Sequence, residues 1–424
     1  MHVAFLTSLV MDGHPTTGYE IANQAIVDGL RRLGVRVSVL GFRLPRQQVP
    51  TDPDTHVLAV LDLENASADF KAKVKFAVRA VVHGLPISAS KLTVFPEEAV
   101  AAALAQVEPV DLKIFNSYQM AAAFPSLFDE RSFFLAHNIE HVSAEQNARS
   151  ATGFLQRFLY KRDARLLAEI EQHLVSTARY TWTLTEEDGE TLGVPADRGG
   201  VLPLILPTAT LRTPPNAPEA PPRDFMTTPT LQPHDSDMAG ADIGLIGTWT
   251  WEPNRVGLEW FLKRVVGLLP GDFSIQVAGS LPEDMPRPER VTFLGRVPSA
   301  ASFLKSVRVV PLVAQGGTGV QLKTVEAFQT GLACVATRSS LRGISVLPRN
   351  CRQADDPVSF AAALTELIGE ARRGKNTRID GGEFLRGQSA AFHESLVHGL
   401  EAVFDMSPAA QLLASGETVY PQAS

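Results

Sequence analysis

The chain contains the stretch Gly316-Gly317-Thr318-Gly319-Val320-Gln321-Leu322-Lys323-Thr324-Val325-Glu326-Ala327. It follows a short apolar run at 307–312, which predicts a buried strand. Three glycines within four positions allow backbone N–H groups to approach a bound anion without obstruction from a Cβ atom. The helix expected next directs the positive end of its dipole toward the same anion. The stretch therefore predicts a strand, an anion-binding loop and a helix in succession.

Two charged side chains of this stretch are expected on one face of the helix, because Lys323 and Glu326 are three residues apart. A cation beside an amide-rich loop suits a diphosphate, and a carboxylate beyond it suits a pair of ribose hydroxyls. The combination indicates a nucleotide-sugar site. From these residues alone, a glycine-rich turn that serves only tight packing stays open as the alternative.

The composition is that of a globular protein of 424 residues, long enough for two or three domains. The formal charge of −7 argues against general nucleic-acid binding, because no basic surplus is available to neutralise phosphates. The two cysteines, Cys334 and Cys351, have neither metal-ligand spacing nor a disulfide framework. We expect both to be buried thiols in a reducing compartment.

The first residues lack a basic leader and reach Asp12 too soon for a signal peptide. No run of about eighteen apolar residues occurs, so the sequence predicts no membrane span. We therefore expect a cytoplasmic protein.

Short apolar strands alternate with helical patterns, which predicts an α/β protein with parallel sheets covered on both faces. We expect an N-terminal Rossmann-like domain at 1–207, a proline-rich linker at 208–242 and a second Rossmann-like domain at 243–390. A final helix and a mobile tail would occupy 391–424. The strands are expected at 2–7, 35–40, 56–61, 112–116, 132–137, 181–185, 243–247, 274–278, 291–294, 307–312 and 333–337. Helices are expected from Gly18 to Leu33, over 154–176 and over 392–404.

Four segments resemble, in order, the retaining GT-B glycosyltransferases, the family of bacterial mannosyltransferases and sucrose synthases. Gly18 opens the first helix, and Ala136-His137-Asn138-Ile139-Glu140 is similar to a His-Asn-Val-Glu segment of the polysaccharide-assembly sub-branch. Gly247-Thr248-Trp249-Thr250-Trp251-Glu252-Pro253-Asn254 is similar to the loop that opens the second domain in that subset. The fourth segment is the opening stretch, continued as Glu326-Ala327-Phe328-Gln329-Thr330-Gly331-Leu332-Ala333-Cys334-Val335-Ala336-Thr337. The resemblance implies two doubly wound domains that face each other across a cleft, the domain at 1–207 on the acceptor side and the domain at 243–390 binding the nucleotide sugar.

The chain departs from the family pattern at one position. Many members carry two glutamates separated by seven residues, the first of which contacts the transferred sugar, whereas this chain has Thr318 there. A sub-branch with a Gly-Gly-Gly-Thr-Arg-Leu-Lys loop also lacks the first glutamate, and this chain resembles it with Gln321 in place of Arg. The sugar would then be held by loop amides, by Thr318 or by other residues.

The resemblance implies catalytic roles for His137, Glu326 and Lys323. Here Glu326 would bind the ribose diol, Lys323 the diphosphate, and His137 a hydroxyl of the donor sugar. Solvated or purely structural roles are the alternatives for each of these side chains. The residues expected to bind the donor are Gly18, Gly247, Thr248, Gly316, Gly317, Thr318, Gly319, Lys323 and Glu326. Trp249 and Trp251 could stack on a base or sugar, but packing is the simpler interpretation.

The expected activity is transfer of a sugar from a nucleoside diphosphate to a glycan or lipid-linked acceptor, with no cofactor besides the donor substrate. No Asp-x-Asp arrangement follows a strand, so we expect no catalytic metal; Lys323, loop amides and a helix dipole would stabilise the leaving group. The resemblance implies a front-face retaining mechanism and a role in bacterial surface polysaccharide assembly. A nucleotide-sugar epimerase of the same fold and a non-catalytic glycan- or nucleotide-binding subunit are the alternatives.

A basic stretch allows two interpretations. Lys71, Lys73, Lys75 and Arg79 alternate with apolar residues, and a second group could enlarge the same face. The simpler interpretation is a solvated helix surface. The other is peripheral contact with the cytoplasmic face of the inner membrane or with a lipid-diphosphate acceptor. The second group comprises Arg149, Arg157, Lys161, Arg162 and Arg165.

Overall fold

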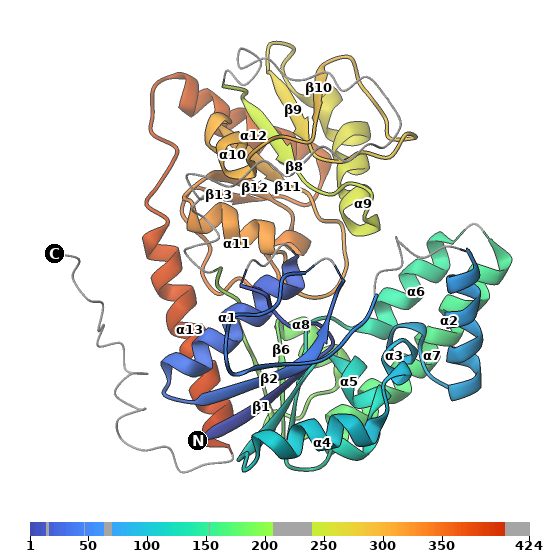
Figure 1. Ribbon diagram of the computed structural model, residues 1–424. Coiled ribbons are helices and arrows are strands. Elements are labelled where there is room, and N and C mark those ends of the chain that lie inside the picture. Colours follow the sequence, from blue (N-terminus) through green and yellow to red (C-terminus); the bar gives the residue numbers. More distant parts are fainter. Residues whose placement is uncertain (14–16, 46, 63–69, 152, 207–239, 403–424) are drawn as a thin grey trace. The chain divides into compact units, whose positions relative to one another are not determined.

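The computed structural model describes residues 1–424 except 14–16, 46, 63–69, 152, 207–239 and 403–424, and the side chains of 70–75 and 301 are also left out. The chain forms two compact units (Figure 1). Unit 1 contains Met1–Ile205, Thr318–Val320 and the chain from Gln388 onward. Unit 2 contains the described residues of Leu206–Gly317 and Gln321–Gly387.

Unit 1 is built on a seven-stranded parallel sheet in the order β3-β2-β1-β4-β5-β6-β7. In the centre of the sheet, Phe5 of β1 pairs with Val39 of β2 and Ile114 of β4. The strands are β1 (His2–Thr7), β2 (Arg36–Arg43), β3 (Thr55–Val60), β4 (Leu112–Asn116), β5 (Ser132–Ala136), β6 (Tyr180–Thr183) and β7 (Gly199–Val201).

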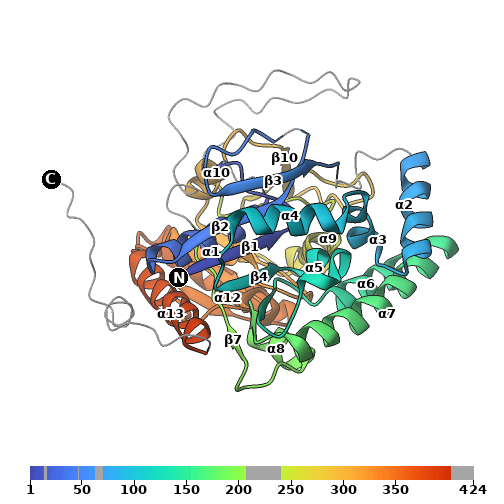
Figure 2. The same cartoon turned by 60° about the horizontal axis from the view of Figure 1, so that its bottom comes forward.

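Nine helices, together with two short 3₁₀ turns, accompany this sheet among the described residues. Helices α2, α3, α6 and α7 gather at one end of the unit (Figure 2). The helices are α1 (Gly18–Arg32), α2 (Phe70–His83), α3 (Ile87–Ser90), α4 (Glu97–Val107), α5 (Tyr118–Ala123), α6 (Glu140–Ser150), α7 (Phe154–Thr177), α8 (Glu186–Leu192) and α13 (Gly382–Glu401), the last of which begins in unit 2, with the short turns η1 (Leu92–Val94) and η2 (Pro125–Leu127).

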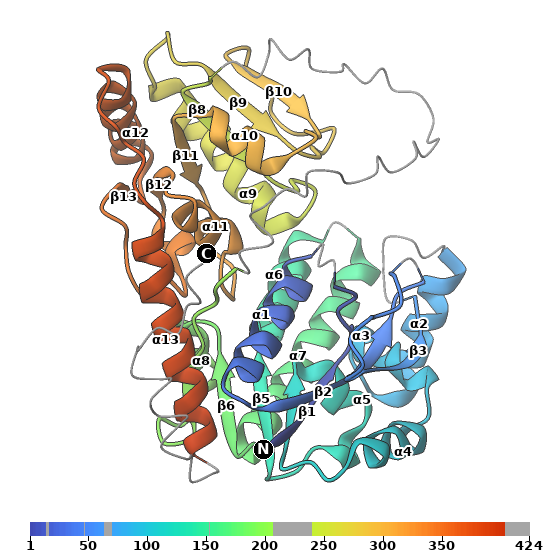
Figure 3. The same ribbon diagram turned by 60° about the vertical axis from the view of Figure 1, so that its left-hand side comes forward.

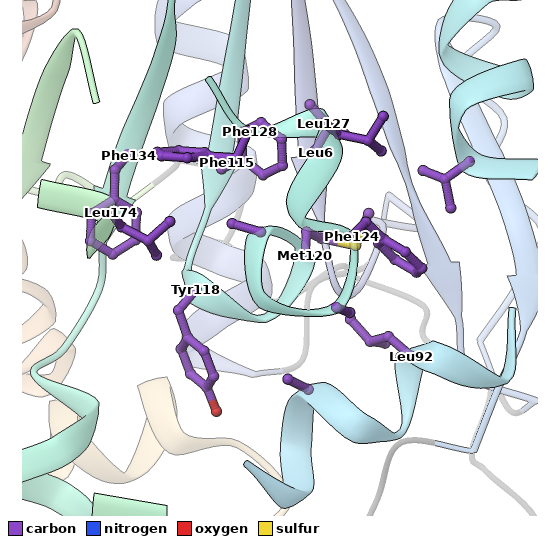
Figure 4. Close-up of a cluster of buried hydrophobic side chains, with 14 of the residues drawn as sticks. Leu6, Leu92, Phe115, Tyr118, Met120, Phe124, Leu127, Phe128, Phe134 and Leu174 are labelled. Carbon is purple, nitrogen blue, oxygen red and sulfur yellow. The ribbon is translucent and has the colours of Figure 1, made fainter. Parts of the chain in front are cut away.

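The two faces of this sheet are covered by different helices, because successive strand residues point to opposite sides. On one face, Leu6 and Phe115 pack with Met120 of α5 and Leu174 of α7 (Figure 4). The other face meets α1 and α13, which lie side by side (Figures 1 and 3). A Cβ atom on Gly29 of α1 would come within 2.5 Å of the Phe392 ring of α13, so Gly29 allows this close approach.

Unit 2 has a six-stranded parallel sheet in the order β10-β9-β8-β11-β12-β13. Its main core joins Leu245 and Val277 of the strands to Leu258, Phe360 and Leu364 of two helices. Its strands are β8 (Ile243–Ile246), β9 (Ile275–Ala278), β10 (Val291–Gly295), β11 (Val309–Leu312), β12 (Ala333–Ala336) and β13 (Cys351–Gln353). Its helices are α9 (Glu252–Trp260), α10 (Ala300–Ser306), α11 (Leu322–Gln329) and α12 (Pro357–Arg372), with the short segments η5 (Phe261–Val265), η6 (Val266–Leu268) and η7 (Arg338–Leu341).

The predicted α/β class with two doubly wound parallel sheets is confirmed. Every predicted strand is present, and within the described residues the sequence missed only the three-residue edge strands β7 and β13. The last predicted helix begins at Gly382 rather than at 392, and its residues from Gln388 belong to unit 1. Most of the predicted linker, the tail beyond 402 and the side chains of Lys71, Lys73 and Lys75 lie outside the described residues.

Two further features agree with the sequence. Both cysteines are buried and free, and burial raises the pKa of the Cys351 thiol to about 12. No helix in the described ranges is both long enough and apolar enough to cross a bilayer.

Docking of α13 on unit 1 can be tested at Gly399. A Cβ atom there would overlap the indole ring of Trp182, which is fully buried and donates its Nε1–H to the carbonyl of Ser395 at 3.2 Å. Helix propensity alone would make Gly399→Ala stabilising by about 0.5–1 kcal/mol. Because overpacking outweighs propensity, we expect destabilisation by about 1–3 kcal/mol, measured by calorimetric unfolding.

The matched control is Gly267→Ala, because a Cβ atom at Gly267 meets nothing within 4 Å. Equal melting temperatures for the two variants would contradict the packing described for α13.

Candidate functional site

The glycine-rich loop that follows β11 is divided between the two units. Gly316 and Gly317 belong to unit 2, whereas Thr318 and Gly319 belong to unit 1. Gly317 has φ +107° and its carbonyl accepts a hydrogen bond from the guanidinium of Arg342. Because an L side chain rarely adopts such a φ, the loop conformation requires glycine here.

In unit 2, Lys323 lies over the ring of Trp249, with Nζ 4.8 Å from the ring centroid. A Cβ atom on Gly247 would come within 2.5 Å of that same Nζ, so the glycine makes room for the ammonium group. Burial lowers the pKa of Lys323 to about 8, and Glu326 opposes the shift. The structure therefore brings a partly desolvated cation, an aromatic face and the end of β8 together.

Glu326 lies on the same helix as Lys323, and burial raises the pKa of its carboxyl while Lys323 lowers it. Both side chains line a small hollow of about 50 Å³ in unit 2. Other walls come from Trp249, Asn254 and Ser340. A volume of this size holds only a few water molecules. A half-buried cation and a half-buried carboxylate thus lie on one wall of this hollow.

The loop after β8 contributes less than the sequence suggested. The N–H of Gly247 donates to the carbonyl of Ala278 at 3.2 Å, so it is already used in the fold. Thr248 is exposed, and its N–H has no acceptor in the described part of the chain. Trp249 is buried and donates Nε1–H to Ala278 at 2.8 Å, whereas Trp251 is 56% exposed. Of the predicted pair Gly247 and Thr248, only Thr248 therefore has a backbone N–H available to a ligand.

In unit 1, His137 follows β5 at the carboxyl edge of the sheet, where sites of open parallel sheets lie. Its Nε2–H donates to Oδ1 of Asn116 at 2.6 Å, which fixes the tautomer and leaves Nδ1 as an acceptor. The ring centroid lies 5.0 Å from that of Tyr19. Burial lowers the pKa of His137 to about 4, so the imidazole is neutral at physiological pH.

Asn116 connects the ends of the central strands, and sequence reasoning missed it. Its Nδ2 lies 3.0 Å from the Thr7 hydroxyl, 2.8 Å from the Tyr19 hydroxyl and 2.9 Å from Oδ1 of Asn23. The signal available was its position at the end of an apolar strand, as for His137. This network holds the imidazole in place.

The remaining predicted site residues also lie in unit 1. The N–H of Gly319 donates to Asp188 at 2.8 Å, and the Thr318 hydroxyl lies 3.2 Å from that of Ser143. Gly319 has φ +72°, and a Cβ atom there would lie 2.6 Å from the His137 carbonyl oxygen. Gly18 is the first residue of α1. The structure thus groups Thr318 and Gly319 with His137, and groups Gly247 with Lys323 and Glu326.

Comparisons with known proteins agree with this architecture. Residues 240–370 match the family model described as "Glycosyl transferases group 1". A sequence search of curated proteins gives no match.

Solved structures resemble nearly the whole chain. Sucrose-phosphate synthase from Thermosynechococcus elongatus has a TM-score of 0.60 and 15% identity, covering 98% of this chain and 100% of that one. WaaG, a glycosyltransferase involved in lipopolysaccharide biosynthesis, has a TM-score of 0.54 and 14% identity, covering 99% and 100%. HepE from Anabaena, in complex with UDP and glucose, has a TM-score of 0.55 and 12% identity, covering 95% and 100%. At these identities the likeness shows the shared fold, which is GT-B.

The neutral state of His137 predicts an acid-sensitive contribution to stability. Its folded pKa of about 4 lies below the unfolded value near 6.5, so the unfolded chain binds the proton more readily. The contribution is therefore complete above pH 6.5 and is lost as the pH falls through 4. Between pH 7.0 and 4.5, we expect wild type to lose roughly 2–3 kcal/mol more than His137→Gln, measured by urea unfolding.

The control is His173→Gln, because His173 is exposed on α7. If His137→Gln and His173→Gln show the same pH dependence as wild type, His137 is not held neutral in the folded protein.

Proposed function

We propose that this glycosyltransferase, whose residues 240–370 form a group 1 domain, moves a sugar from a nucleoside diphosphate to a glycan or lipid-linked acceptor. The reaction retains the anomeric configuration, needs no metal ion and serves bacterial surface polysaccharide assembly. The observation that carries the proposal is the placement of Lys323 and Glu326 on one wall of the unit 2 hollow. WaaG, described as a lipopolysaccharide enzyme, supports the choice of pathway by analogy of fold.

Lys323 supplies the charge that the leaving diphosphate requires. With a pKa of about 8 the ammonium is mostly protonated at neutral pH, and an adjacent diphosphate favours the charged form further. Burial strengthens its interaction with developing negative charge relative to an exposed lysine. Glu326 accepts hydrogen bonds from the ribose diol and so positions the nucleotide.

His137 binds the donor sugar rather than transferring a proton. Its Nε2–H is occupied by Asn116, and the neutral Nδ1 can accept a hydrogen bond from a sugar hydroxyl. The loop residue Thr318 belongs to the same unit and supplies its hydroxyl to that sugar, whereas the Gly319 N–H already donates to Asp188 at 2.8 Å. Neutral groups would thus hold the donor sugar in place of the glutamate that many family members use.

Turnover of variants tests these roles. Lys323→Ala should reduce release of nucleoside diphosphate about a hundredfold or more, because transition-state charge is no longer stabilised. Glu326→Ala should raise the donor KM about tenfold or more. His137→Ala should also reduce turnover severely. Activity is measured with a panel of nucleotide sugars chosen by thermal shift, with and without EDTA, which should make no difference.

An exposed lysine and an exposed glutamate provide matched controls for the Lys323 and Glu326 variants. Lys305 lies on α10 and Glu366 on α12, where its side chain is 57% exposed. Lys305→Ala and Glu366→Ala should leave turnover unchanged. An isomerised sugar as product would identify an epimerase, donor binding without turnover would identify a binding subunit, and near-normal activity in all three site variants would refute the assigned site.

We also propose that unit 1 binds the anionic surface of a membrane, at its cytoplasmic face, through the first turns of α7. Phe154, Leu155 and Phe158 are 87%, 69% and 57% exposed, which is unusual for three large apolar side chains so close together. A hollow of about 700 Å³ between α6 and α7 is lined by four cations and one carboxylate, Glu145, which is paired with Arg149 at 3.1 Å. The cations are Arg149, Arg157, Lys161 and Arg165. Apolar insertion flanked by basic groups is the chemistry of peripheral membrane binding.

Sedimentation with vesicles tests this surface. Wild type should bind vesicles containing phosphatidylglycerol, bind phosphatidylcholine vesicles weakly, and dissociate at high salt. The triple variant Phe154→Ser, Leu155→Ser and Phe158→Ser should lose most of the binding. The control is Val358→Ser, an exposed apolar residue of α12 in unit 2. Equal binding by the triple variant and the control would refute the proposed surface.

A further inference from the structure

Unit 1 contains a second hollow, of about 530 Å³, that none of the roles above uses. Five helices that lie together in Figure 2 enclose it, namely α2, α3, α5, α6 and α7. Its walls combine carboxyl, hydroxyl and amide groups with aliphatic and aromatic carbon. The residues are Phe76, Ala77, Ile87, Ser88, Tyr118, Glu140, Ser143, Ala144, Asn147, Gln156, Leu159, Tyr160, Asp163 and Leu167.

Tyr118 is directed into this hollow by an unusual backbone. The preceding residue, Ser117, has φ 67° and ψ 168°, a combination that residues other than glycine rarely adopt. The ring packs in the apolar core, while its hydroxyl points away from that cluster (Figure 4). There it forms a hydrogen bond with Ser88. A strained residue thus places a polar group at the end of β4.

Glu140 occupies the equivalent place after β5. Its N–H donates to Glu171 at 2.7 Å, and the Glu171 carboxylate also accepts from His141 at 2.6 Å. Burial, and then repulsion by Glu171, raise the pKa of Glu140 to about 7. Its carboxyl interacts with the side chain of Asn138, which leaves acceptor positions for a ligand in the hollow.

The charge of the walls limits what can bind. Asp163 is paired with Arg162 at 3.1 Å and accepts from the Ile87 N–H at 3.1 Å. Among the described residues that line the hollow there is no lysine, arginine or histidine. Anions are therefore disfavoured. Since Glu140 is the one lining carboxyl without a cationic neighbour in the described contacts, a neutral ligand with several hydroxyl donors fits best.

We propose that this hollow binds a neutral sugar ring of the acceptor, with Glu140 accepting hydrogen bonds from its hydroxyls and Ile87 and Leu159 contacting its C–H faces. The assignment of the sugar to an acceptor rests on the proposed transferase function. Its location supports that role, because Glu140 follows His137 by three residues and its charge acts on both Tyr118 and Tyr19. Tyr19 in turn contacts the His137 ring.

Saturation-transfer NMR tests the site directly, without depending on turnover. The probes are the methyl glycosides of glucose, galactose, mannose and N-acetylglucosamine, with glucosamine and glucuronic acid as charged comparisons. At least one neutral glycoside should bind wild type. Glu140→Gln should weaken that binding about tenfold or more, because a charge-assisted hydrogen bond is replaced by a weaker one.

A second variant blocks the hollow without a change in the core. Asn147 lines it but is exposed on α6, so Asn147→Trp should fold and should abolish glycoside binding. The control, Glu145→Gln, alters an exposed carboxylate of the same helix that is paired with Arg149, and should bind as wild type does.

The outcomes separate this inference from the transferase proposal. Binding of no neutral glycoside, preference for a charged sugar, or unchanged binding in both Glu140→Gln and Asn147→Trp would overturn the sugar site. Wild type that binds a glycoside but is not stabilised by any nucleoside diphosphate would instead contradict the donor site.

Discussion

Every strand of each sheet runs in the same direction, so all the strands of a unit end at one edge. Buried polar groups at that edge have no neighbouring strand residue to bind and must be satisfied by one another. In unit 1 the Asn116 amide meets this need, since its oxygen accepts from His137 while its nitrogen faces Thr7, Tyr19 and Asn23. The candidate site of this unit is built on these satisfied groups, which belong to rigid strands and helix starts.

The candidate functional groups are ionisable side chains that lose solvation on burial and have no partner that fully replaces it. Burial lowers the pKa values of His137 and Lys323 and raises those of Glu140 and Glu326. Such groups destabilise the folded state relative to apolar residues of similar size, and they concentrate where ligands bind. By contrast, Asp242 in the same unit as Lys323 is held by Arg372 at 2.7 Å, and its pKa is lowered, as in an ordinary structural ion pair.

The sequence predicted the elements whose pattern is local. Strand β1 and helix α7 appear almost at their expected bounds, because the apolar period depends only on neighbours in the chain. Strands β7 and β13 were missed, since three residues carry too little pattern. The predicted start of the final helix was too late, because the glycines at the true start resemble a helix stop.

The candidate site divides in the same way. The pairing of Lys323 with Glu326 follows from helical spacing alone and could be predicted. The Tyr118 and Glu140 hollow could not, because its walls come from segments nearly a hundred residues apart that only the folded sheet brings together. The available signal was that Tyr118 and Glu140 each begin a helix soon after the carboxyl end of a strand. The hydrogen bond from the Gly247 N–H to the Ala278 carbonyl could not be predicted either, because it depends on the register of the sheet and not on spacing along the chain.

The division of unit 1 along the chain has a consequence for its synthesis. Met1–Ile205 leaves the ribosome about 180 residues before the part of α13 that completes the unit, an interval of roughly 10–40 s at ordinary translation rates. During this interval Gly29 and Trp182 lack the helix that buries them. In the nascent unit, the part of the apolar sheet face beneath α13 therefore stays uncovered until the last helix emerges.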